Sequence, residues 1–103
     1  MNNCAPPAGE GGFVTAGDGW TYAGTLTFGN AAAVFEASRA AALPAAGVVD
    51  LAGLGHADSA ALAVMLALKR RAAREGTRIA FASVPPGIHR LARVYGVEDL
   101  LAG

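Results

Sequence analysis

The sequence has little cysteine, little charge and no long apolar run, and each shortage excludes a class of protein. The single cysteine, Cys4, excludes a disulfide framework and fits a reducing compartment. Only 16% of the 103 residues are charged and the formal net charge is zero, so no overall positive field draws in nucleic acid. No apolar run reaches the roughly 18 residues of a membrane span, so we expect no direct membrane insertion. Only three residues precede Cys4, too few for an apolar export signal, and we expect a cytoplasmic protein.

Motifs for catalysis and for metal binding are missing as well. The two histidines, His56 and His89, are not spaced like metal ligands, and no glycine-rich phosphate loop is present. A serine hydrolase using Ser59 with either histidine is disfavoured, because Asp58 and Ala60 flank the serine where a nucleophile elbow has a different pattern. We therefore expect a binding protein that is not an enzyme and that uses no cofactor.

The pattern along the chain predicts one α/β domain after a short tail. Residues 1–12 are rich in proline and glycine and are predicted to be a disordered tail, with residues 13–103 forming the domain. A hairpin followed by two strand–helix–strand crossovers predicts a two-layer fold, with a small mixed sheet and the helices packed on one face. Strands are expected at 13–17, 20–28, 48–51 and 77–83, and helices at 31–42, 59–75 and 86–95, with a last turn at 97–101.

The second expected strand alternates cleanly. Trp20, Tyr22, Leu26 and Phe28 fall on one face with a period of two, which predicts that they cover the core side of the sheet. Gly24 interrupts this face and is expected to mark a bulge or a close helix crossing.

The junction between the third strand and the second helix is the candidate functional site. Asp58 is expected to cap the helix, with its carboxylate accepting from the N–H of Ala60 or Ala61. Ser59 then stands in the first turn with its hydroxyl facing outward. Unpaired N–H groups and the helix dipole at such a corner favour an acceptor, a phosphate or a partner's side chain. The same pair of residues is also typical of a plain helix cap.

The one basic cluster lies at the end of the second helix and in the strand after it. A cationic last turn complements the helix dipole, and we interpret the cluster in that way. Its members are Lys69, Arg70, Arg71, Arg74 and Arg78.

The segments GVVDLAGLGHADSAALAVMLALKRRAAREG and VPPGIHRLARVYGVEDLL closely resemble the STAS domain family (sulfate transporter and anti-sigma factor antagonist), and within it the MlaB branch. The resemblance covers nearly everything after the tail. It implies that Ser59 corresponds to the serine or threonine that a partner kinase phosphorylates in anti-sigma factor antagonists, and Asp58 to the acid before it. Ala61 stands where the family usually has glycine, and we expect its methyl group to crowd the approach of a kinase to Ser59.

The resemblance implies a non-catalytic accessory subunit. Such a subunit binds the cytoplasmic ATPase of a bacterial phospholipid-transporting ABC complex, peripheral to the inner membrane, and supports its assembly or activity in maintaining lipid asymmetry. The alternative is an anti-sigma factor antagonist that binds an anti-sigma factor kinase and is regulated by phosphorylation at Ser59. The residues expected on the partner surface are His56, Asp58, Ser59, Leu62, Arg90 and Arg93.

Overall fold

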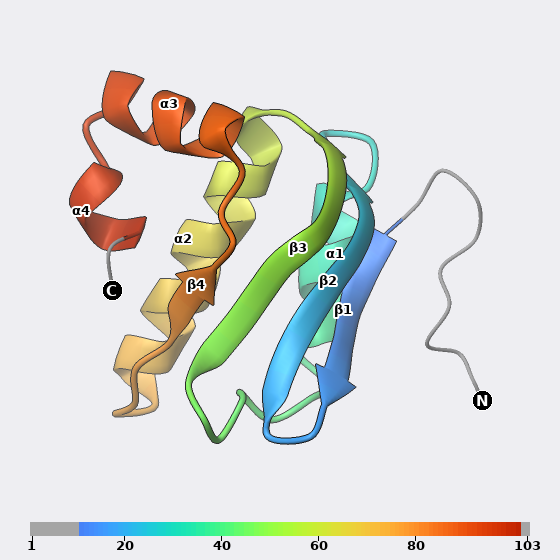
Figure 1. Ribbon diagram of the computed structural model, residues 1–103. Coiled ribbons are helices and arrows are strands. Elements are labelled where there is room, and N and C mark those ends of the chain that lie inside the picture. Colours follow the sequence, from blue (N-terminus) through green and yellow to red (C-terminus); the bar gives the residue numbers. More distant parts are fainter. Residues whose placement is uncertain (1–10, 102–103) are drawn as a thin grey trace.

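The computed structural model describes residues 11–101, whose strands and helices follow the predicted order (Figure 1). Of the predicted tail, residues 1–10 lie outside the described residues, whereas Gly11 and Gly12 already belong to the first strand. The elements are β1 (Gly11–Ala16), β2 (Gly19–Leu26), α1 (Ala31–Ser38), β3 (Val48–Ala57), α2 (Ser59–Arg74), β4 (Ala80–Ala82), α3 (Pro86–Val94) and α4 (Glu98–Leu101).

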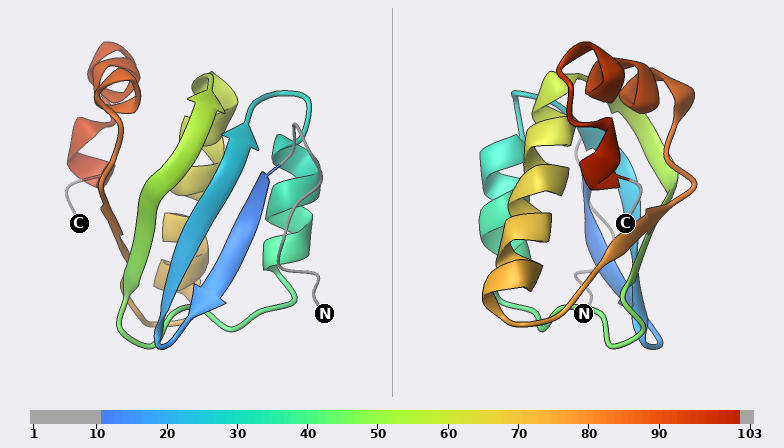
Figure 2. Two further views of the ribbon diagram at one scale, coloured as in Figure 1. Left: turned by 45° about the vertical axis from the view of Figure 1, so that its right-hand side comes forward. Right: turned by 90° about the vertical axis from the view of Figure 1, so that its left-hand side faces the viewer.

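The strands form a mixed sheet in the order β1-β2-β3-β4. β1 and β2 make an antiparallel hairpin, and β3 runs parallel to both β2 and β4. Helices α1 and α2 lie on the same face of this sheet, with α3 and α4 packed beside α2 (Figure 2). The predicted two-layer α/β fold is confirmed. A helix connects each parallel pair of strands, α1 between β2 and β3 and α2 between β3 and β4, and each helix buries its apolar stripe on the same face of the sheet.

β3 is much longer than predicted, because it continues from Leu51 to Ala57. Its pairing with β2 shifts twice, and each time β3 uses one residue more than its partner: Thr21 and Ala23 pair with Asp50 and Gly53, and Gly24 and Leu26 with Leu54 and Ala57. Two bulges of this kind break the simple alternation of side chains. The buried positions are therefore Val49, Leu51 and Leu54, a spacing that gave no strand signal in the sequence.

Gly53 shows why the bulged segment needs glycine. A Cβ atom placed there would collide with the carbonyl oxygen of Tyr22 on the neighbouring strand. His56 was expected in a turn, and it lies instead near the end of this extended strand. The bulge predicted at Gly24 is confirmed, since one of the two register shifts falls between Gly24 and Leu26.

Element ends follow their local chemistry. α2 has its predicted start and stops within one residue of its predicted end, and Gly76 follows it with a φ of 74°. α1 ends at Ser38 rather than at residue 42. The N–H groups of the next three residues, 39–41, each donate to the carbonyl three residues earlier, as in a 3₁₀ turn. β4 spans only Ala80–Ala82 instead of the predicted 77–83.

The core lies between the sheet and the helices. Its centre is formed by buried side chains of β2, β3, α2 and α3, among them Trp20, Tyr22, Leu26, Val49, Leu51, Met65, Leu68 and Ile88. Two aromatic residues depart from expectation. Phe28 was predicted on the covered face, but it lies beyond the end of β2 and its side chain is 79% exposed. Tyr95, which its helical spacing from Ile88 and Leu91 predicts to be a core residue, follows α3 and is 58% exposed.

Candidate functional site

Asp58 holds the start of α2 and an adjacent loop together. Its Oδ1 accepts from the backbone N–H of Ala60 at 2.8 Å, which confirms the predicted helix cap. Its Oδ2 accepts from the backbone N–H of Phe28 at 3.2 Å, 30 residues earlier in the sequence. The backbone N–H of Asp58 also donates to the carbonyl of Leu26 at 3.3 Å. One carboxylate therefore fixes the β2–α1 loop against the first turn of α2.

The β2–α1 loop is folded back by Asn30. This residue precedes α1 as predicted, but its side chain makes no cap hydrogen bond to the helix. Its Oδ1 accepts from the N–H of Thr27 at 2.9 Å, and its Nδ2 donates to the carbonyl of Thr25 at 2.9 Å. The hydroxyl of Tyr22 donates to the same carbonyl, and burial raises the pKa of Tyr22 to about 12. The hydrogen bonds of Asn30 and Tyr22 thus order the loop on its inner side, while Phe28 is exposed to solvent.

Ser59 and His56 are accessible beside this loop. Ser59 is the first residue of α2 and is partly exposed, and within residues 11–101 its hydroxyl makes no hydrogen bond. His56 is exposed two residues before Asp58. Ala63, one turn after Ser59 on the same side of α2, is exposed as well. We call Phe28, His56, Ser59 and Ala63 the docking corner.

Leu62 and Ala61 lie in the core, which corrects two expectations. Leu62 was predicted on the partner surface, but it is only 3% exposed, and Ala61 is fully buried. Ala61 lies on the opposite side of α2 from Ser59, and the side chains of both Ala61 and Leu62 belong to the apolar stripe that packs into the core. The methyl group of Ala61 therefore does not crowd the approach to Ser59 from solvent.

Arg90 and Arg93 are both exposed on α3, which lies across the same end of the sheet as the docking corner (Figure 1). Arg93 Nε is 3.4 Å from Glu98 Oε2, so its charge is paired toward α4. Arg90 has no ion pair among the described side chains. Sequence reasoning missed Phe28, whose signal was the Gly29-Asn30 pair directly after it, a combination typical of a strand that has already ended.

Other kinds of site find little support. Among the described residues, no group of three or more histidine, cysteine, aspartate or glutamate side chains is arranged to hold a metal ion. No helix in that part of the chain is long and apolar enough to cross a bilayer. Among the described residues, no base is hydrogen-bonded to the Ser59 hydroxyl.

A family model described as Mlab, STAS domain, matches residues 21–102. The chain belongs to the STAS domain family. The match begins within β2 and includes both the β2–α1 loop and the start of α2, so the docking corner lies inside the family's shared region. STAS domains are generally non-catalytic. A search of curated proteins finds no match to this STAS domain.

Proposed function

We propose that this STAS domain is an accessory subunit that binds the cytoplasmic ATPase of a bacterial phospholipid-transporting ABC complex through the docking corner. It supports the assembly or activity of that ATPase, contributes no catalytic group, and reaches the inner membrane only through the complex. The MlaB-type family match supports the choice of partner. The observation that carries the choice of surface is Phe28, a 79% exposed aromatic residue whose backbone N–H donates to Asp58. The adjacent Ser59 hydroxyl makes no hydrogen bond within residues 11–101.

Phe28 has the properties of an interface anchor. Aromatic side chains supply much of the binding energy at protein interfaces, and they do so best when they are already held in place. The hydrogen bond from Phe28 N–H to Asp58, together with the Asn30 contacts, orders the loop before any partner arrives. The conformational entropy lost when a partner binds is therefore smaller, because this loop is already ordered.

Ser59 and Ala63 fit close contact with a partner. Both are small and lie on one side of α2, so the backbone of a partner segment can approach the helix closely. The Ser59 hydroxyl both donates and accepts, and a polar group of the partner can replace water there. His56 adds a second polar group at the same corner.

The alternative role, an anti-sigma factor antagonist phosphorylated at Ser59, has one observation in its favour. The hydroxyl is accessible, and the buried Ala61 does not obstruct it. Against this role stands Asp58, whose carboxylate already accepts from Ala60 N–H and Phe28 N–H. A phosphate of about −1.5 to −2 charges would be placed beside that fixed negative charge. We therefore propose docking without phosphorylation.

Co-purification with the ATPase tests the docking corner. We expect Ser59→Arg and Phe28→Ala to lose the ATPase while keeping the circular dichroism spectrum of the native domain. The matched control is Ala73→Arg, which adds the same side chain to another exposed position on α2, far from the corner. Stoichiometric co-purification of Ser59→Arg would place the interface elsewhere.

Intact-mass analysis of the protein from its native host separates the two roles. We expect Ser59 to carry no phosphate in most molecules. A substantial phosphorylated population that disappears in Ser59→Ala would favour the antagonist role and a kinase partner.

A further inference from the structure

A groove opens between α1 and α2 at the opposite end of α2 from the docking corner. It has a volume of about 420 Å³ and is lined by Phe35, Arg39, Arg71, Arg74 and Glu75. Along the helix, Arg74 lies roughly 22 Å from Ser59, at 1.5 Å per residue. A ligand in this groove is therefore separate from one at the docking corner.

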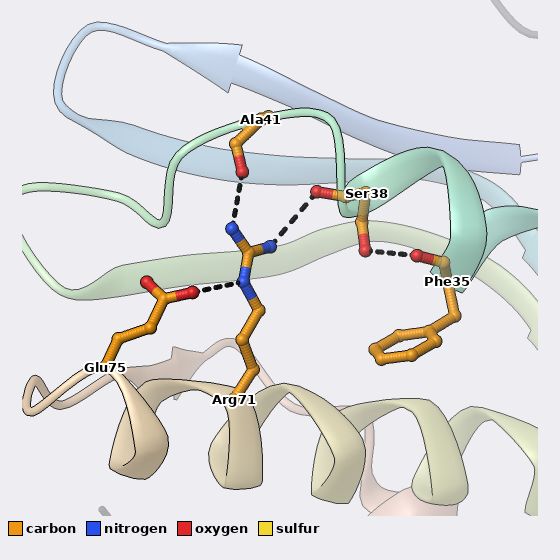
Figure 3. Close-up of polar contacts among 5 residues, drawn as sticks. All are labelled: Phe35, Ser38, Ala41, Arg71 and Glu75. Atoms are coloured by element: carbon orange, nitrogen blue, oxygen red, sulfur yellow. Dashed lines mark hydrogen bonds and ion pairs between the residues drawn. The ribbon is translucent and has the colours of Figure 1, made fainter.

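Arg71, which lines the groove, is fixed by three hydrogen bonds from its guanidinium group (Figure 3). Its Nε donates to Glu75 Oε2 at 2.9 Å, and its two terminal nitrogens donate to the carbonyls of Ser38 at 3.2 Å and Ala41 at 2.7 Å. Its side chain is only 13% exposed. Each guanidinium nitrogen thus already makes a hydrogen bond, and the two terminal nitrogens hold α2 to the end of α1 and the turn after it. Arg71 is therefore a structural residue of the groove.

Two arginines remain available for a ligand. Arg74 is exposed and has no ion pair among the described side chains. Arg39 is paired with Glu36 at 3.3 Å, but both side chains are more than half exposed, so this pair is weak. The one acid that lines the groove, Glu75, is already paired with Arg71. Arg74 therefore adds one positive charge that no described carboxylate neutralises, and the exposed Arg39–Glu36 pair leaves the charge of Arg39 only weakly compensated.

We propose that this groove binds an acidic segment of a partner protein. Arg39 and Arg74 bind carboxylates of the segment, because a planar guanidinium pairs with a carboxylate through two parallel hydrogen bonds. Phe35, whose ring points from α1 toward α2, contacts an apolar side chain of the same segment (Figure 3). The proposal adds a second contact surface and does not depend on the docking corner.

The charges at the rim favour a peptide over an anionic membrane surface. Glu36 is 74% exposed beside Arg39, and Glu75 is 48% exposed at the other wall. A dense layer of anionic headgroups would be repelled by both acids, since its negative charge cannot be arranged around them. A peptide places its carboxylates only where the arginines lie.

Fluorescence anisotropy with the full chain tests the proposal. The probe is a short labelled peptide with paired glutamates on both sides of a central leucine, and the reference peptide has glutamine in place of each glutamate. We expect the acidic peptide alone to bind, and we expect Arg74→Gln to weaken binding roughly tenfold. The matched control is Arg70→Gln, which removes the same charge from an exposed position one turn earlier that does not line the groove. It should change the affinity by less than about twofold.

Backbone amide shifts in NMR locate the bound peptide. We expect them to change around Phe35–Arg39 and Arg71–Glu75 and to stay constant at the docking corner. Absence of binding, equal loss in Arg70→Gln and Arg74→Gln, or binding to phosphatidylglycerol vesicles but not to the peptide would each overturn the proposal. None of these outcomes bears on the docking corner, which is tested by Ser59→Arg against the ATPase.

Discussion

The two ends of α2 are stabilised in different ways. At the first turn a single side chain, Asp58, accepts from one helix N–H and fastens the β2–α1 loop, and Ser59 beside it is partly exposed. At the last turn Gly76, at a positive φ, lets the N–H of Thr77 donate to the carbonyl of Ala72 at 2.9 Å. Arg71 then ties this end to the carbonyls that follow α1.

The comparison shows that one end of α2 presents accessible side chains, while the other end contributes contacts that stabilise the fold. Asp58 and Arg71 each complement the helix dipole, negative at the start and positive at the end. Each also joins α2 to a segment about 30 residues earlier in the sequence, the β2–α1 loop for Asp58 and the end of α1 for Arg71. The last turn, where the Arg71 side chain is 13% exposed, holds the two helices together, and the first turn, where Asp58 caps α2, presents small and aromatic side chains.

The largest expected effect comes from breaking the last-turn contacts. We expect Arg71→Ala to lower the free energy of unfolding by about 2–3 kcal/mol, because it removes a charged donor from two carbonyls and from Glu75. Urea denaturation measures the change. Arg70→Ala, at an exposed neighbouring position, is the control and should stay within about 0.5 kcal/mol. Equal midpoints for the two variants would show that the guanidinium contributes no net stability.

Breaking the first-turn contacts of α2 should lower the free energy of unfolding by less than breaking the last-turn contacts. We expect Asp58→Ala to lower the free energy of unfolding by about 1–2 kcal/mol, since a helix cap and a loop contact are lost together. Asp58→Asn keeps a carbonyl acceptor and should retain most of this stability. If Asn behaves like Ala in urea denaturation, the negative charge rather than the acceptor carries the effect.

Tyr22 supports the same corner from beneath the loop. Its pKa is raised by burial to about 12, above its usual 10.0, so the folded state favours the protonated phenol. This contribution is complete below about pH 10 and is lost as the pH rises toward 12. Tyr22→Phe should cost about 0.5–1.5 kcal/mol at neutral pH through the lost bond to Thr25.

The alkaline range provides the second half of that test. In urea denaturation between pH 10 and 12, stability should fall more steeply in the native protein than in Tyr22→Phe. Parallel pH profiles for the two proteins would contradict the assignment of this titration to Tyr22.

The smallest expected effect on stability is that of Ser59→Ala. The hydroxyl makes no hydrogen bond among the described residues, so the free energy of unfolding should change by less than about 0.5 kcal/mol. Thermal unfolding followed by circular dichroism is sufficient to measure this. A loss as large as that of Asp58→Ala would make Ser59 part of the cap and weaken its role as a docking residue.

Much of the site was predictable because its signals are local. The aspartate before an apolar helix predicted the cap, and Gly76 predicted the end of α2, both within one turn of the residues concerned. The tight hairpin was predicted too: the Asp18-Gly19 pair indicated a two-residue turn, and the turn residues in the structure are Gly17 and Asp18, one position earlier. The exposure of Phe28 was not predictable from alternation, because the period of two does not show where β2 stops.

By itself, the sequence determined the order of the elements, the α/β class, the STAS resemblance and the cap at Asp58, since each depends on residues close together in the chain. Only the tertiary structure decided which residues from distant parts of the chain are in contact with one another. The bulges of β3 follow from its pairing with β2, and the burial of Ala61 and Leu62 follows from the face that α2 turns to the sheet. Arg71 finds its acceptors 30 and 33 residues away, at carbonyls that every residue carries and that no local pattern marks.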